Sequence, residues 1–167
     1  VLELLIGFGI AYFINSRFKN RGILVTVLML PMMLSPVIVG LFWKYILANN
    51  WGVVNYIIHG IFKLPEVLWL SSLEYGFWAI VIVDIWMWTP FMILITLAAL
   101  GSVPQAELEA AQIDRLSWFK RFRYIILPHG RFILMLGILL RTIDSFKTMD
   151  LIFVMTRGGP GNVTEFI

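Results

Sequence analysis

The feature that most constrains this chain is an apolar run from Gly22 to Trp43, 22 residues without a charged side chain. Roughly 20 apolar helical residues are enough to cross the hydrocarbon core of a bilayer. Pro31 and Pro36 lie inside the run, and in lipid such breakers persist only where protein or a cavity satisfies the freed carbonyls. The run therefore predicts a membrane span over residues 23–43 that is kinked and packed within a bundle.

The composition of the whole chain favours lipid as its solvent. Hydrophobic residues make up 60% of the 167 residues and charged residues 14%, whereas soluble domains average roughly 45–50% and 25%. So few charges cannot supply the polar shell that a water-soluble globule needs. These numbers exclude a soluble enzyme, a disordered chain and a disulfide scaffold. The absence of cysteine also excludes thiolate nucleophiles and cysteine-ligated metal sites.

Two further stretches are apolar enough to be predicted as spans. The first covers residues 76–100, carries the single charge of Asp84 and has Pro90 near its middle. The second covers residues 132–154. Residues 1–15 are apolar but too short to cross alone, so we interpret them as the end of a longer helix. The expected fold is all-α, a polytopic transmembrane helix bundle in one domain that is truncated at both ends.

The connections between these stretches alternate between basic and nearly neutral. Lys and Arg number 3 in residues 16–22, 1 in residues 48–75, 5 in residues 101–131 and 1 in residues 156–167. Because basic connections stay in the cytoplasm, the first and third are predicted to lie inside and the other two outside. The external segment 48–75 also contains aromatic residues suited to a membrane interface, namely Trp51, Tyr56, Trp69 and Tyr75. It is interpreted as short helices on the membrane or over the mouth of the bundle.

The cytoplasmic connection, residues 101–131, has the pattern of two short amphipathic helices. Ser102 and Gln105 have the spacing of a capping box, which predicts a helix start. Ser117 is expected to cap a second helix, which Pro128 closes. The first helix is acidic and the second basic. Their apolar faces could lie on lipid headgroups or dock on another protein, and the residues alone leave both possibilities open.

The order of residues in this connection resembles the EAA loop of binding-protein-dependent ABC importer permeases. The matching positions are Glu109, Ala110, Ala111, Asp114, Phe122, Ile125, Leu127 and Pro128. Arg115 stands where that family usually has glycine. Further along, residues 144–165 resemble the carbohydrate branch of the family, whose loop is matched by Gly158, Gly159, Pro160 and Gly161. Trp86, Trp88 and Pro90 fit the same branch.

The resemblance implies a permease subunit that forms half of the pathway of an ATP-driven sugar importer in the bacterial inner membrane. It implies a multi-pass transport protein that is not an enzyme and holds no cofactor, with Mg-ATP bound by a partner subunit. The implied partners are membrane lipid, a second homologous permease, a cytoplasmic ATPase dimer, a periplasmic or lipid-anchored solute-binding protein and a carbohydrate, without nucleic acid. The outer segments, including residues 158–161, would meet the binding protein. That glycine-rich loop lacks the Lys-Ser/Thr of a phosphate-binding motif.

The resemblance also assigns roles within the cytoplasmic connection. Glu109 would pair with a basic group of the ATPase, and Phe119 and Phe122 would help to fill a groove on it. The remaining members of the expected coupling set are Ala110, Ala111, Asp114, Arg115, Leu127 and Pro128. If the family's glycine is left-handed, Arg115 costs on the order of 1 kcal/mol in its place and the loop could bend differently.

Four charges of alternating sign occur every third residue in the last predicted span: Arg141, Asp144, Lys147 and Asp150. At about 1.5 Å per residue, Arg141 lies about 14 Å along the span from Phe132, near the bilayer midplane, where a bare charge is costly. The four could neutralise one another as a ladder of i, i+3 pairs or line a polar translocation path that binds sugar hydroxyls. We prefer the path and include Asp84 as a weaker member, while Trp86 and Trp88 are interpreted as interface anchors.

Two other classes of protein remain as alternatives. An ion-coupled secondary transporter would use Asp84, Asp144 and Asp150 to bind the coupling ion. A non-transporting membrane scaffold would use the cytoplasmic helices to recruit a soluble partner, but it leaves the charges of the last span without a use. His59 and His129 have no second ligand at metal spacing, so no metal site is expected.

Overall fold

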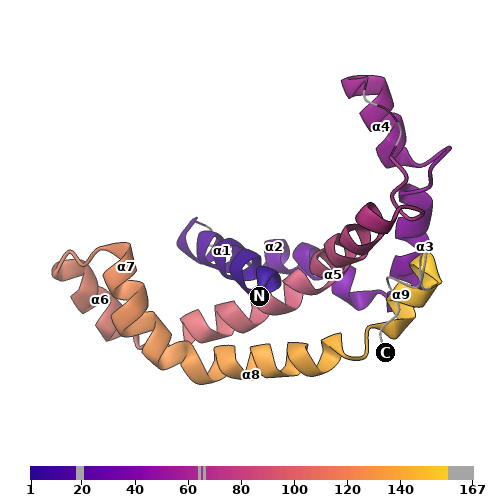
Figure 1. The fold of residues 1–167 in the computed structure, drawn as a ribbon. Coiled ribbons are helices and arrows are strands. Elements are labelled where there is room, and N and C mark those ends of the chain that lie inside the picture. Colours follow the sequence, from indigo (N-terminus) through magenta and orange to yellow (C-terminus); the bar gives the residue numbers. More distant parts are fainter. Residues whose placement is uncertain (18–20, 64, 66, 158–167) are drawn as a thin grey trace. The chain divides into compact units, whose positions relative to one another are not determined.

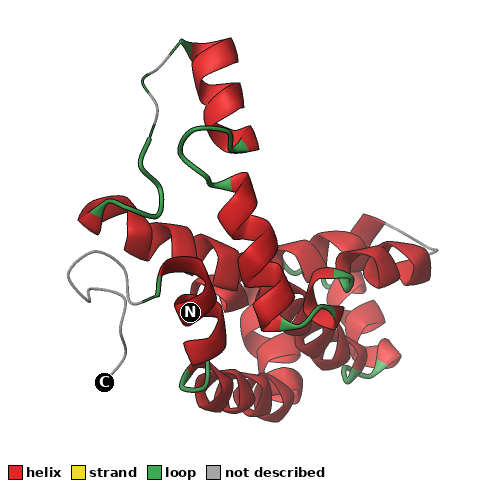
Figure 2. Cartoon of the chain, turned by 90° about the vertical axis from the view of Figure 1, so that its right-hand side faces the viewer, coloured by secondary structure: helices red, strands yellow, loops and turns green. Residues whose placement is uncertain are grey.

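The computed structural model of the chain describes residues 1–17, 21–63, 65 and 67–157. Every regular element in these ranges is a helix (Figure 2). In chain order (Figure 1) they are α1 (Leu2–Arg17), α2 (Arg21–Leu28), η1 (Pro31–Met33), α3 (Pro36–Ile46), α4 (Val53–Phe62), α5 (Leu73–Gly101), α6 (Gln105–Ile113), α7 (Trp118–Arg121), the π-helical segment η2 (Phe122–Ile126), α8 (Leu127–Ser145) and α9 (Met149–Thr156). The all-α fold class predicted from the sequence is confirmed.

The helices belong to two compact units. The first consists of residues 1–29 and 88–144, and the second of residues 30–87 together with the chain from Ser145 onward. Both units receive part of α5, a 29-residue helix with Pro90 in its interior. A proline inside a helix has no N–H to donate to the preceding turn, and this weakens the helix locally. The boundary between the units falls beside this proline, between Met87 and Trp88.

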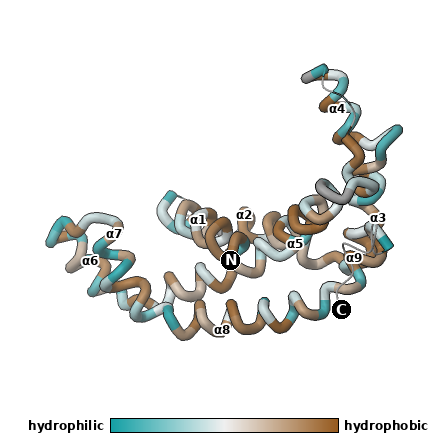
Figure 3. Tube along the Cα trace, in the orientation of Figure 1, coloured by the Kyte–Doolittle hydropathy of each residue, from teal (hydrophilic) through white to brown (hydrophobic). Residues whose placement is uncertain are grey.

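Within the described part of the chain, 2 helices are long and apolar enough to cross a membrane. They are Tyr75–Gly101, which coincides with the predicted span 76–100, and Trp118–Ser145. Figure 3 shows hydrophobic residues along both α5 and α8. How many times the chain crosses the membrane stays a prediction.

The apolar run 23–43 is not one helix. α2 ends at Leu28, Pro31–Met33 form a 3₁₀ turn, and α3 begins at Pro36. Ser35 has extended dihedral angles, φ −64° and ψ 140°, as expected of a residue that precedes a proline. The expected kinked helix is therefore broken into separate helices at two closely spaced prolines, and whether the run crosses the membrane once stays a prediction.

The predicted span 132–154 is also interrupted. α8 ends at Ser145 and α9 begins at Met149. In the turn between them, the Thr148 hydroxyl donates to the Ser145 carbonyl oxygen at 3.0 Å. Such local side-chain bonds offer the backbone an alternative to the helix, so hydropathy alone did not locate this break.

Glycines allow the helices of the first unit to pack closely. A Cβ added to Gly7 of α1 would lie 2.7 Å from the Met92 Cβ of α5. One added to Gly137 of α8 would lie 2.5 Å from the Ile95 Cγ2. Small residues at these crossings permit the backbone approach that helix packing in lipid requires. Where α5 leads into the connection 101–131, the buried side chains of Leu100, Val103 and Ile126 form a small core.

In the second unit, α3 and α9 lie side by side, and Gly40 permits the contact (Figure 1). The side chain of Asn55, which is 3% exposed, forms a second set of stabilising contacts in this unit. Its Nδ2 donates to the carbonyl oxygens of Asn49 and Val67, both at 3.0 Å. Its Oδ1 accepts from the Val67 N–H at 3.2 Å and from the Trp69 Nε1 at 3.0 Å. One amide thus ties the start of α4 to the chain that leads into α5.

Candidate functional site

The cytoplasmic connection folds as two short helices, but its first helix is not held by a capping box. Pro104 occupies the N-cap position of α6 and no side chain caps the helix. Ser102 lies too early, and its hydroxyl donates instead to the Ala99 carbonyl oxygen of α5 at 2.8 Å. Similarly, Ser117 is the N-cap residue of α7 but its side chain makes no capping bond. The helix starts were predicted within a residue or two, and the bonds proposed for them were wrong.

Arg115 adopts the left-handed conformation that was considered for the family's glycine, with φ 49°. The Arg115 N–H donates to the Gln112 carbonyl oxygen at 3.1 Å, and the Leu116 N–H to the Ala111 carbonyl oxygen at 3.0 Å. These two bonds form a Schellman motif, which ends α6 and normally carries glycine at the left-handed position. The left-handed turn therefore forms with arginine in the position that favours glycine.

Because only glycine adopts this conformation without a Cβ penalty, we expect Arg115→Gly to raise the free energy of unfolding by about 1 kcal/mol. Arg115→Ala removes the charge but keeps the Cβ, so it should give no such gain. Equilibrium unfolding of the two variants in mixed micelles separates the backbone effect from the charge. A gain of equal size in both variants would show that the guanidinium, and not the backbone, is responsible.

Pro128 does not close the second helix. α7 continues through η2 into α8, so that one helix runs from Trp118 to Ser145. In η2 the Leu127 N–H donates to the Phe122 carbonyl oxygen, five residues back. A π turn of this kind re-registers the backbone hydrogen bonds, and this allows a helix to continue past a proline that would otherwise clash with the carbonyl four residues earlier.

The predicted coupling residues differ in their exposure. The side chains exposed to solvent are Glu109, Ala110, Asp114, Arg115, Phe119 and Pro128. Phe122 and Leu127 are half-buried, whereas Ala111 is only 2% exposed. Ala111 therefore packs inward, away from any surface that a partner could contact. Ile113 is a large apolar side chain of α6 that is 82% exposed, and it lies one helical turn after Glu109. The sequence analysis missed Ile113, although its i, i+4 spacing from Glu109 was a usable signal.

Phe122 lies in an aromatic cluster that links α7 and η2 to α1. Its ring is stacked on Trp118, with centroids 5.6 Å apart, and meets Phe8 edge to face at 5.0 Å. Tyr12 in turn meets Trp118 at 5.5 Å. These contacts hold Phe122 within the first unit, so it does not present a free ring to a groove on a partner. Phe119, at 65% exposed, does.

A polar contact also joins α6 to α8. The His129 Nε2 lies 3.4 Å from the Glu107 Oε1, and both side chains are partly exposed. The His129 Nδ1 lies 2.9 Å from the Ile125 carbonyl oxygen. His129 is a partly exposed residue of the connection, and it helps to hold α6 beside the start of α8.

The charge of Arg141 is neutralised by a partner that the sequence analysis missed. The Arg141 Nε lies 2.7 Å from the Glu3 Oε2 of α1, and its Nη2 lies 2.8 Å from the Glu3 Oε1. Both side chains are nearly buried, at 8% and 11% exposed. This two-pronged geometry is the strongest form of carboxylate recognition by arginine. A single carboxylate in the apolar stretch 1–15 was the available signal, since such a charge requires a partner.

The remaining neighbours of Arg141 are weaker. Its Nη1 lies 3.5 Å from the Asp144 Oδ2, the one i, i+3 pair of the predicted ladder that forms. Its guanidinium carbon lies 5.1 Å from the centroid of the Trp88 ring, a cation–π distance. Trp88 therefore contacts a buried charge, which is a different role from the interface anchor that was predicted for it. The ladder stops at Asp144 because α8 ends at the next residue.

The other predicted pathway residues lie in the second unit. Asp84 is half-buried in α5, and Lys147 and Asp150 are exposed in the turn before α9 and in its first turn. The five charges are thus divided between the two units. Residues 158–161, predicted to meet a binding protein, lie outside the described part of the chain. Among the described residues there is no group of three or more metal-ligating side chains.

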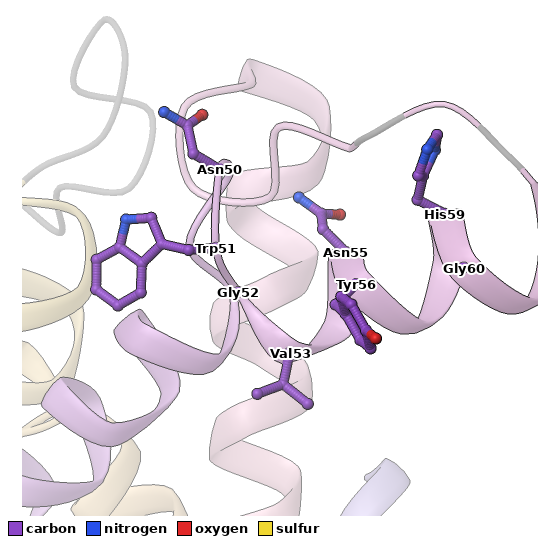
Figure 4. Close-up of a pocket in the computed structure, with 8 residues that line it drawn as sticks. All are labelled: Asn50, Trp51, Gly52, Val53, Asn55, Tyr56, His59 and Gly60. Carbon is purple, nitrogen blue, oxygen red and sulfur yellow. The ribbon is translucent and has the colours of Figure 1, made fainter.

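The aromatic residues of the outer segment differ in their surroundings. Trp51 and Tyr56 are 68% and 80% exposed and border a shallow groove of about 500 Å³ beside α4. Figure 4 shows that Trp51 points away from Tyr56, so their rings do not converge on one point. Trp69, in contrast, is held by its bond to Asn55. The first two fit the predicted interface anchors better than a stacking site for a sugar ring.

Together these features define an α-helical protein in which part of the connection 101–131 belongs to the same helix as one of the two segments long and apolar enough to cross a membrane. The chain belongs to the family of binding-protein-dependent transport system inner membrane components, whose profile matches residues 3–164. This confirms the resemblance drawn from the EAA loop.

Relatives with known names extend over nearly the whole chain. It is 39% identical over 166 residues to the trehalose/maltose transport system permease protein MalF of Thermococcus litoralis, an alignment covering 99% of this chain and 56% of the relative. It is 39% identical over 163 residues to the probable ABC transporter permease protein y4oQ of Sinorhizobium fredii, covering 98% and 52%. The chain thus spans about half the length of these relatives, and the similarity is to the carbohydrate branch that the sequence predicted.

A solved structure has the same fold. It is a bacterial alginate ABC transporter in complex with an alginate pentasaccharide-bound periplasmic protein, which superimposes with a TM-score of 0.78 at 24% identity. The alignment covers 96% of this chain and 56% of that one. At this level of identity the similarity shows that the two chains share a fold.

Proposed function

We propose that this chain is the core of a permease subunit that forms half of the translocation pathway of an ATP-driven importer for a sugar or sugar-like solute. Its family consists of components of binding-protein-dependent systems. Relatives are named for the transport of trehalose and maltose, of sulfoquinovosyl glycerol and of starch degradation products. Membership of this family favours the importer over an ion-coupled transporter that uses Asp84, Asp144 and Asp150, and over a non-transporting scaffold.

The proposed assembly has four kinds of partner. A second homologous permease would complete the pathway, and a cytoplasmic ATPase dimer would bind Mg-ATP. A periplasmic or lipid-anchored binding protein would deliver the carbohydrate to the outer segments, including residues 158–161. The complex would lie in a prokaryotic inner membrane with several crossings, in the orientation that the Lys and Arg counts predict.

The observation that carries the coupling part of this proposal is the continuous helix from Trp118 to Ser145. A partner that moves α6 and α7 would displace this helix as a rod, and the displacement would reach Arg141 near its other end. Phe122 would pass part of the same movement to α1 through its contact with Phe8. We therefore assign docking to the exposed Glu109, Ala110, Ile113 and Phe119, and support of the loop to Ala111 and Phe122.

The charges are proposed to have two roles. Arg141 uses two of its nitrogens on Glu3, so its role is to hold α1 and α8 together in the membrane. Asp144, whose side chain is 40% exposed, is a better candidate to meet solute hydroxyls along the path. Asp84, Lys147 and Asp150 would line the part of the path that belongs to the second unit.

Uptake into vesicles that contain the complete complex tests the proposed function. We expect accumulation of labelled sugar to require ATP on the cytoplasmic side and the binding protein on the other side. It should persist when an ionophore removes the proton and sodium gradients. Vesicles without ATP serve as the control. Uptake that follows an ion gradient and ignores ATP would instead support the ion-coupled transporter.

A further inference from the structure

The second unit contains a pocket that none of the roles above uses. It has a volume of about 480 Å³ and lies where the ends of α3 and α9 meet the turn before α5. Its lining comes from three separate parts of the chain, residues 44–49, 70–71 and 155–157. Pockets for small molecules have volumes of about 300–1,000 Å³, so this one can hold one or two sugar rings. The segments that form it are largely those predicted to lie on the outer side.

The lining of this pocket has an apolar floor and a polar wall. Leu47 and Met155 are buried, at 6% and 1% exposed, and they form the floor. The polar side chains around it are Lys44, Asn49, Ser71, Thr156 and Arg157. Two of these are cations and none is a carboxylate. A neutral sugar is usually held by carboxylates, amides and aromatic faces, whereas paired cations favour an anionic group.

Local structural needs do not account for both cations. Lys44 lies in the last turn of α3, where a cation stabilises the helix dipole, and its Nζ lies 3.4 Å from the Val154 carbonyl oxygen. Arg157 follows α9 in the left-handed conformation, φ 52°, which costs a non-glycine residue on the order of 1 kcal/mol. Neither side chain forms an ion pair with a described residue. Both cations line the pocket, and none of its other lining residues in the described part of the chain carries a negative charge.

We propose that this pocket binds the anionic group of an acidic saccharide, such as the carboxylate of a hexuronate, before it enters the pathway. The proposal rests on the proposed function for the identity of the ligand as a sugar. Lys44 and Arg157 bind the carboxylate, and the amide of Asn49 and the hydroxyls of Ser71 and Thr156 bind sugar hydroxyls. The apolar floor of Leu47 and Met155 lies against the ring carbons.

The test uses the complete permease in nanodiscs of neutral phospholipid, with glucuronate and glucose as probes in saturation-transfer NMR. We expect glucuronate to bind and glucose to bind at least tenfold more weakly, because a carboxylate gains charge-assisted bonds that a hydroxyl does not. Arg157→Gln and Lys44→Gln should each weaken glucuronate binding by on the order of tenfold. The matched control is Lys63→Gln, which removes a basic residue of the same outer region that is also left-handed, φ 53°, but lies outside the pocket.

Equal binding of the two sugars, or equal effects of Arg157→Gln and Lys63→Gln, would overturn the proposal. A phospholipid headgroup offers similar anionic chemistry, so a second set of nanodiscs contains phosphatidylglycerol. Glucuronate binding that survives this lipid supports the saccharide site, and binding that the lipid abolishes assigns the pocket to headgroups. The assay needs neither ATP nor a binding protein. Its result is therefore independent of whether the permease proves to be part of an ATP-driven importer.

Discussion

Replacing Glu3 by glutamine is expected to lower the free energy of unfolding by about 3–5 kcal/mol, because it leaves a buried arginine without its counter-charge. The Arg141 side chain is 8% exposed and uses two nitrogens on this one carboxylate, at 2.7 and 2.8 Å. Neither Asp144 at 3.5 Å nor the ring of Trp88 replaces a charge at those positions. Equilibrium unfolding in mixed micelles measures the loss.

The same arginine supplies the matched control. Asp144→Asn removes a carboxylate that is 40% exposed and makes one long contact, so it should cost less than about 1 kcal/mol. The double variant Glu3→Gln with Arg141→Met replaces the pair by uncharged side chains of similar size and should recover most of the stability. Equal losses for Glu3→Gln and Asp144→Asn would show that the Glu3 pair does not hold α1 to α8.

Glu109→Lys is expected to reduce ATP-driven uptake by about 30- to 4,000-fold while the subunit stays in the membrane. Glu109 is exposed on α6, on the same side as Ile113. It forms no ion pair within the described part of the chain, so its replacement breaks none there. If it meets a basic group of the ATPase, reversing its charge removes an attraction and introduces a repulsion, which together cost about 2–5 kcal/mol at a buried interface. Uptake into vesicles, with the membrane content of the subunit measured alongside, tests this expectation.

Glu107→Lys is the matched control for the charge reversal. Glu107 lies on the same helix but two residues earlier, so its side chain points to a different face and contacts His129. We expect uptake by this variant to stay within a few-fold of the wild type. Normal uptake by the Glu109→Lys variant, or equal loss in both variants, would contradict a docking role for Glu109.

The helical fold and the cytoplasmic connection could be predicted from the sequence because both depend on local patterns. Apolar runs and the scarcity of charge require helices in lipid. The spacing of Ser102 and Gln105, together with Ser117, located the helix starts to within two residues. The order of residues around Glu109 identified the family. Even the left-handed turn at Arg115 was considered, since the family's glycine marks the position where the backbone must reverse.

Local patterns were less reliable where helices break or continue. The runs 23–43 and 132–154 have the hydropathy of single spans, yet each contains a break, while Pro128 marks no break at all. Hydropathy measures the preference of the side chains for lipid or water, and it carries no information on backbone hydrogen bonds. Backbone hydrogen bonds in the π turn before Pro128 let the helix continue, whereas the bond of the Thr148 hydroxyl stabilises the turn after α8. Which of these backbone conformations has the lower free energy depends on the neighbouring side chains.

By itself, then, the sequence determined the class of fold and the family. Only the tertiary structure showed that Arg141 forms an ion pair with Glu3 and that the ring of Phe122 packs against Phe8. It also showed that Lys44 and Arg157 line the same pocket. The physical reason is the same in each case. A buried charge or ring requires a partner, but the partner can lie anywhere along the chain, and Glu3 and Arg141 are 138 residues apart.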